Sequence, residues 1–121
     1  MRRIDLSQYT VSIQRPDPAT GTVRTEDVRF DVGHSITTIL FGQGVDGREL
    51  LKRDAIAKKI EAAGAEDVLL EEEEYQTVLN AFRAWKTFSR HEVEMLRRIE
   101  NAPQVNVAAL ARRPNRKRSR G

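Results

Sequence analysis

Six basic side chains and no acidic ones lie in the last eleven residues of the chain, ARRPNRKRSRG. Guanidinium groups bind phosphate oxygens as planar, bidentate forks, so this run predicts contact with nucleic-acid phosphates or another anionic surface. Because the segment has no aromatic residue to stack on bases, we expect contact that is insensitive to base sequence. A solubilising terminus and a basic localisation signal are the alternatives. The cations are Arg112, Arg113, Arg116, Lys117, Arg118 and Arg120.

More arginines flank the junction predicted between the last two helices, WKTFSRHEVEMLRRI. We predict that Arg90, Arg97 and Arg98 extend the phosphate-binding surface of the tail, and an ordinary solvated rim is the alternative. The junction also permits a helix-turn-helix. Its turn lacks the usual glycine, however, and the second helix offers only Arg90 and His91 near its start for reading bases.

Residues suited to catalysis are sparse. The chain has two histidines, His34 and His91, and no cysteine. It contains no nucleophile elbow, zinc-protease motif, phosphate-binding loop or dinucleotide fingerprint. An enzyme would need a concave pocket around one of the two histidines. We therefore predict a protein that is not an enzyme and uses no cofactor.

Four consecutive glutamates occupy positions 71–74. Successive residues of a helix point about 100° apart, so these carboxylates cannot converge on one cation, and we predict no metal site. At the start of a helix they would instead interact with the positive end of the helix dipole. An acidic patch that meets a partner's basic surface is the alternative.

An aromatic stripe follows on the helix predicted from about 70 to 88. Its spacing predicts a core-facing side. Trp85 and Phe88 are also candidates for a protein interface, because large aromatic side chains anchor binding hot spots. The stripe consists of Tyr75, Val78, Phe82, Trp85 and Phe88.

The elements that must position these residues begin with a β-hairpin over about 8–31, whose strands flank the turn sequence RPDPATG. A short helix capped by Ser35 and ending at Gly42 should follow, with an apolar strand as the alternative. The next helix begins at Asp46 with Glu49 in a capping box and ends at Gly64. Its inward face should hold Leu50, Ile56, Ala57, Ile60 and Ala63.

The last helix begins at Ser89 with Glu92 in a second capping box, and Pro103 prevents its continuation. Val93, Leu96 and Ile99 should face inward. The order of elements predicts an α+β fold, an N-terminal β-hairpin packed on a small bundle of three to four helices. Residues 1–103 form this domain. Residues 104–121 form a C-terminal arm, basic from 112 and expected to be disordered.

The composition suits a small binding protein. Of 121 residues, 39% are hydrophobic and 32% charged, and no apolar run approaches the roughly 20 residues of a membrane span. No secretory signal is evident. The net charge is +3, and subtracting the +6 of the tail leaves −3 for the body. The body and the tail therefore need not share a partner.

Residues 47–105 resemble small proteins encoded in bacteriophage genomes. The shared features are GRELL, AKKI, the helix start LLEEEEY and a charged final helix ending in APQV. The resemblance implies a phage or mobile-element origin and carries no catalytic motif. We expect a virion structural or assembly protein, located in the host cytoplasm or the virion. A small transcription regulator or an inhibitor of a host defence enzyme is the alternative.

The expected partners follow from the same division between body and tail. The body should bind a protein or further copies of itself, through the hairpin edge or the apolar helix faces. DNA or RNA should bind the tail, and no membrane partner is expected.

Overall fold

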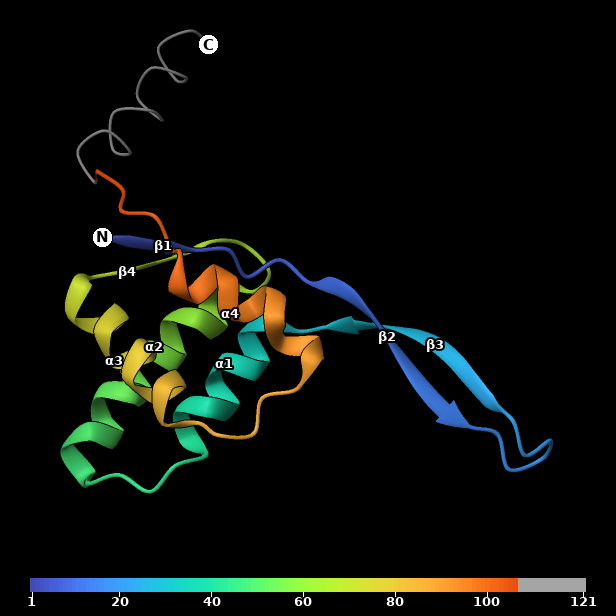
Figure 1. Ribbon diagram of the computed structural model, residues 1–121. Helices are drawn as coiled ribbons and strands as arrows, with labels where there is room; N and C mark the ends of the chain where they lie inside the picture. The colour runs from blue at the N-terminus through green and yellow to red at the C-terminus, as the bar shows by residue number, and fades with distance from the viewer. Residues whose placement is uncertain (107–121) are drawn as a thin grey trace, which may run out of the picture.

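The computed structural model describes residues 1–106 (Figure 1). All six tail cations, within 107–121, lie outside the described residues. The predicted α+β fold is confirmed, because antiparallel strands accompany four helices. The elements are β1 (Arg2–Ile4), β2 (Tyr9–Pro16), β3 (Val23–Phe30), α1 (Val32–Phe41), α2 (Gly47–Ala63), β4 (Val68–Leu70), α3 (Glu72–Ala84), the short 3-10 helix η1 (Arg90–Glu92) and α4 (Val93–Glu100).

The four helices and the β1–β4 pair enclose one hydrophobic core. Its centre is formed by branched aliphatic side chains that are almost fully removed from water, which is the main favourable contribution to folding. No helix within residues 1–106 is long and apolar enough to cross a membrane. The largest fully buried side chains include Ile4, Leu6, Ile36, Ile39, Leu40, Ile56, Ile60, Leu70, Met95 and Ile99.

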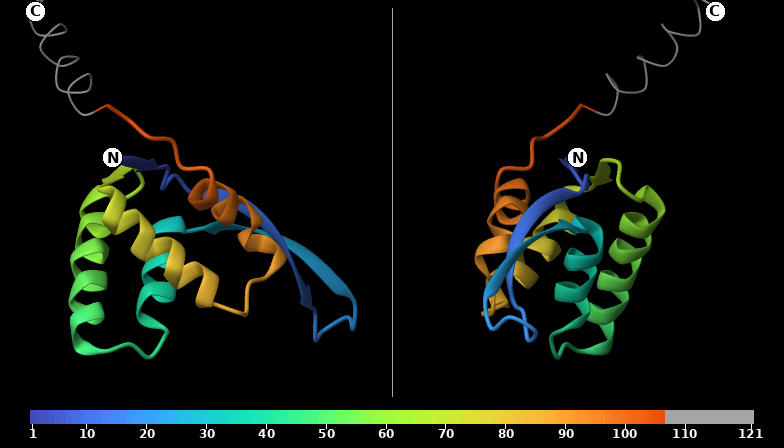
Figure 2. Two further views of the ribbon diagram at one scale, coloured as in Figure 1. Left: turned by 60° about the vertical axis from the view of Figure 1, so that its left-hand side comes forward. Right: turned by 90° about the vertical axis from the view of Figure 1, so that its right-hand side faces the viewer.

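The predicted hairpin is confirmed, and most of it projects from the bundle (Figures 1 and 2). Strands β2 and β3 pair from Tyr9 opposite Phe30 to Pro16 opposite Val23. At the root the rings of Tyr9 and Phe30 stack 4.9 Å apart and pack against the core. At the tip Gly21 has φ +71, a conformation that glycine adopts without strain.

A second, smaller sheet joins the two ends of the described chain. β1 pairs antiparallel with β4, and Gln104 forms a bridge to Arg2 on the other side of β1. The backbone N–H of Arg3 donates to the Pro103 carbonyl, and that of Val105 donates to the Met1 carbonyl. Residues 104 and 105, predicted as the start of the arm, are therefore joined to the body.

Three predicted features of the first two helices differ from the structure. The first helix is capped by Asp31 rather than Ser35, because the Asp31 carboxylate accepts from the His34 backbone N–H at 3.0 Å. Asp46 caps α2 as predicted, but Glu49 pairs with the buried Arg53 rather than with its cap. Leu50, predicted to face inward, is 45% exposed. Gly64 ends α2 with φ +65, as predicted.

The last two helices also differ in extent from the prediction. Helix α3 begins at Glu72 because the preceding residues form β4, and it ends at Ala84. Ser89 and Glu92 form the predicted capping box, which begins the 3-10 helix η1. Met95 rather than Val93 faces the core, since Met95 is fully buried and Val93 is 39% exposed.

Candidate functional site

A groove of about 500 Å³ runs between the root of the hairpin and the last helical segment. The Tyr9 hydroxyl donates to the His91 carbonyl at 2.7 Å and so fixes β2 to η1. One wall is the start of β2 and the other is the exposed side of η1 and α4. The lining residues are Tyr9, Thr10, Val11, Ser12, Arg90, His91, Val93, Glu94 and Arg97.

Arg90 and Arg97, two of the predicted phosphate-binding residues, lie on the same wall of this groove. Both are exposed, and neither side chain forms an ion pair or hydrogen bond with a residue between 1 and 106. Guanidinium groups without intramolecular partners keep all their donors for an anion. The structure therefore places these two cations on one wall beside the hairpin, and it is the neighbouring hairpin that sequence spacing did not indicate.

Arg98, the third predicted body residue, has a different environment. Its guanidinium donates to the Ser7 carbonyl at 2.6 Å and to Glu94 at 3.0 Å, and it lies over the Tyr9 ring. Its side chain is only 15% exposed. Arg98 therefore connects α4 to the chain segment between β1 and β2, and its donors face the protein rather than a ligand.

The Arg98 charge also affects Asp5, whose carboxylate lies 3.8 Å away. Partial burial acts to raise the pKa of Asp5, but hydrogen bonds from Ser7 and the Arg98 charge outweigh it, and the pKa lies below the ordinary value. Asp5 is therefore ionised at neutral pH and supports the position of Arg98.

The two interface candidates, Trp85 and Phe88, lie beyond the end of α3. Both are half-buried and pack against the core, and the Phe88 ring lies 5.7 Å from that of Phe82. Trp85 covers Gly42 so closely that a Cβ there would lie 2.6 Å from the indole. Each side chain thus has an intramolecular role, and their proposed interface role stays a prediction.

Exposed apolar side chains occur instead where α1 ends and α2 begins. Leu51 is 72% exposed, and Phe41 and Leu50 are each 45% exposed. The prediction placed Leu50 on the inward face, but Leu50 and Leu51 lie near the start of α2, and both are exposed.

Three of the four glutamates at 71–74 take separate structural roles. Glu71 caps α3, and Glu74 bonds both the Glu71 backbone N–H and the Lys59 ammonium. Glu72 pairs with Arg2 at 2.9 Å. No cluster of three or more potential metal-ligating side chains occurs in the described part of the chain.

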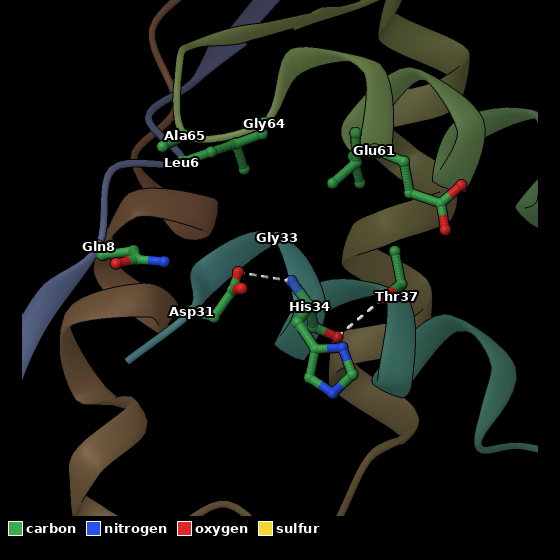
Figure 3. Close-up of a pocket in the computed structure, with 10 residues that line it drawn as sticks. Leu6, Gln8, Asp31, Gly33, His34, Thr37, Glu61, Gly64 and Ala65 are labelled. Atoms are coloured by element: carbon green, nitrogen blue, oxygen red, sulfur yellow. Dashed lines mark hydrogen bonds between the residues drawn. The ribbon is translucent and has the colours of Figure 1, made fainter. Parts of the chain in front are cut away.

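A pocket of about 420 Å³ lies beside His34, with Gln8, Asp31 and Glu61 among its lining residues. The Asp31 carboxylate is turned toward the His34 backbone N–H, and the Thr37 hydroxyl donates to the His34 carbonyl (Figure 3). These polar groups hold the first turn of α1. The His34 ring makes no hydrogen bond to any residue that the structure describes. Among residues 1–106, no carboxylate therefore orients the His34 ring by a hydrogen bond.

The linker between α3 and α4 bears on the helix-turn-helix interpretation. Residues 85–89 form neither helix nor strand, and η1 then precedes α4. Arg90 and His91, the predicted base-reading residues, lie in η1 and not on α4. The linker at 85–89 and η1 thus stand where the predicted motif has its tight turn, and the residues predicted to read bases precede α4.

The chain matches no protein-family model, no curated protein and no solved structure. A proposed function therefore has to rest on the sequence and on the groove beside β2, with the unpaired cations on its wall.

Proposed function

We propose that this chain is a non-enzymatic, phage-type accessory protein with a role in virion structure or assembly. Its body binds protein, and its basic C-terminal segment binds nucleic-acid phosphates or an acidic surface. The site of action is the virion or the host cytoplasm. The observation that carries the proposal is the set of cations without acidic neighbours at positions 112–120.

Arg90 and Arg97 support the nucleic-acid part of the proposal. They are exposed on one wall of the groove, and their side chains lack intramolecular partners among residues 1–106. A phosphate backbone that contacts them and the tail together would be held at two places. Such contacts fix position and carry no base specificity.

The projecting hairpin supports the protein-binding part. Within residues 1–106 no strand pairs with the outer edge of β2 or of β3. Unpaired strand edges present rows of backbone donors and acceptors that favour pairing with another chain. The alternative function is a small DNA-binding transcription regulator or an inhibitor of a host defence enzyme. A regulator of helix-turn-helix type gains no support from the linker at 85–89.

Duplex binding as a function of salt tests the nucleic-acid part. We expect the full chain to bind a random-sequence duplex with a log–log salt slope of up to about −5, because six paired cations release counterions. Removal of residues 111–121 should abolish most of this dependence. Fluorescence anisotropy with labelled duplex measures both.

A matched comparison separates the groove from the tail. Replacing Arg90 and Arg97 by glutamine should weaken binding about equally for different duplex sequences. Equal affinity of the full chain and the 111–121 deletion at low salt would rule out binding through the tail.

A further inference from the structure

The hairpin carries an apolar face that continues beyond the core. Val11, Ile13 and Val28 are half-buried on the same face as Tyr9 and Phe30, but only the latter two pack against the core. A two-stranded ribbon gains little stability by itself in water, and a third strand or a covering surface is normally required. The outer half of this hairpin therefore lacks a covering surface among residues 1–106 of the single chain.

The two free edges differ in their fitness to pair with a second copy. A two-fold axis perpendicular to the sheet pairs a strand antiparallel with itself about one central residue. For β3 the registers of longest overlap centre on Glu26 or Asp27, and either places two carboxylates directly opposite each other. Like charges in this position are destabilising. The β3 edge is therefore poorly suited to self-pairing.

For β2 a register of equally long overlap centres on Ser12 and opposes no like charges. Val11 then lies opposite Ile13 and continues the apolar face into the second hairpin. Tyr9 lies opposite Arg15, an aromatic ring beside a cation. Thr10 lies opposite Gln14. Each pair occurs twice by symmetry.

We propose that β2 pairs antiparallel with β2 of a second copy about a two-fold axis at Ser12, which forms a four-stranded sheet. This inference rests on the protein-binding part of the proposed function and names a second copy of the chain as the partner.

The groove beside β2 complements the part of the second hairpin that this register brings to it. Residues 13 and 15 of the second copy lie opposite Val11 and Tyr9, which line the groove. This part of the second hairpin carries Ile13 and an ion pair in which Arg15 Nε lies 2.6 Å from Glu26 Oε2. The facing wall offers Val93, Glu94 and Arg97. An apolar side chain and charges of both signs are thus available on each surface.

Oligomeric state, measured on the full chain without nucleic acid, tests the proposal. Size-exclusion chromatography with light scattering, run at chain concentrations of about 10–100 µM, should give the mass of a dimer. The double substitution T10E/Q14E places like charges opposite each other twice. It should raise the dimer dissociation constant roughly fivefold to thirtyfold. T10E/Q14K places opposite charges there and should restore the dimer.

The positions suit this test because both side chains are exposed. Within one chain a carboxylate at position 10 faces Arg29, so the hairpin itself is not strained. Thr25→Glu, on the same face of β3 and away from the β2 edge, is the control and should leave the dimer unchanged.

A monomeric wild-type chain throughout this range overturns the proposal. The proposal is also overturned if T10E/Q14E and T10E/Q14K change the dimer dissociation constant equally, because the contact between the two copies would then lie elsewhere. Circular dichroism checks that all variants are folded. Since no nucleic acid is present, failure here is distinct from failure of tail binding in the anisotropy experiment.

Discussion

Arg97 and Arg98 are neighbours in the sequence with opposite environments. Arg97 is exposed on the groove wall, whereas Arg98 donates to the Ser7 carbonyl and to Glu94. The rotation of about 100° between successive helical residues turns one guanidinium to solvent and the other to the protein. Identical residue types thus differ in role: Arg98 supports the fold, and Arg97 is free for the binding role proposed for it.

Replacing Arg98 by alanine should lower the free energy of unfolding by about 1.5–3 kcal/mol, because the Ser7 carbonyl and Glu94 lose a charged donor. Urea denaturation followed by fluorescence of the single tryptophan measures this loss. Arg97→Ala is the matched control and should change stability by less than about 0.5 kcal/mol. Similar losses for both variants would contradict the structural role of Arg98.

At the scale of elements, the β1–β4 pair is a junction of distant parts of the chain. Arg2 of β1 donates to Glu72 of α3 and to the Ala102 carbonyl, and its guanidinium lies over the Tyr75 ring. The segment at 103–105 adds backbone hydrogen bonds on the other side of β1. The first and last described residues therefore stabilise one small sheet together.

Truncation distinguishes the segment at 103–105 from the basic segment. Removing residues 103–121 should lower the free energy of unfolding by about 1–3 kcal/mol, because the backbone bonds to Met1 and Arg3 are lost. Removing only residues 111–121 should leave stability unchanged within about 0.5 kcal/mol. Thermal and urea melts of both truncations provide the comparison. Equal destabilisation would show that the junction at β1 contributes nothing of its own.

The Arg2–Glu72 pair gives this junction a pH dependence. The hydrogen bond from Arg2, followed by that from Gln76, lowers the pKa of Glu72 below its ordinary value. A carboxylate with a lowered pKa in the folded state contributes stability above the unfolded pKa, about 4.3, and loses it as pH falls through the folded pKa.

We therefore expect Glu72→Gln to destabilise the protein by a constant amount between about pH 5 and 7 and by progressively less at lower pH. Urea melts across this range measure the difference. In an Arg2→Met background the same substitution should lose most of its pH dependence. If the dependence persists there, its source is a group other than the Arg2–Glu72 pair.

At the scale of the whole molecule, the basic C-terminal segment and the projecting hairpin are different parts of the chain. The body is net acidic and carries the projecting hairpin, whereas the cations concentrate at positions 112–120. A dimer formed through β2 would carry two basic segments. The molecule would then bind nucleic acid by two linked contacts, which raises avidity without any new contact type.

On a long duplex the proposed dimer should therefore show a log–log salt slope of up to about −11, against about −5 for a monomer, because twelve rather than six cations can pair. The comparison uses the wild-type chain and T10E/Q14E at equal chain concentration. Equal slopes for a dimeric wild type and a monomeric variant would show that only one segment binds at a time.

Local features of this fold were predictable from the sequence because they depend on residues a few positions apart. The turn residues between two alternating segments specify the hairpin. The caps at Asp46 and Ser89 and the glycine at position 64 each act within one turn of helix. The concentration of cations near the C-terminus is likewise a property of sequence alone.

Features that join distant residues required the tertiary structure. The pairing of Val68–Leu70 with β1 was missed because a three-residue strand has no period of its own, and its partner lies at the other end of the chain. The groove forms because β2 lies beside α4 in the folded chain. Only this packing shows that Arg97 lines the groove, whereas Arg98 donates to the Ser7 carbonyl. Burial and pairing across long separations arise from packing of the whole core, so neither residue type nor spacing specifies them.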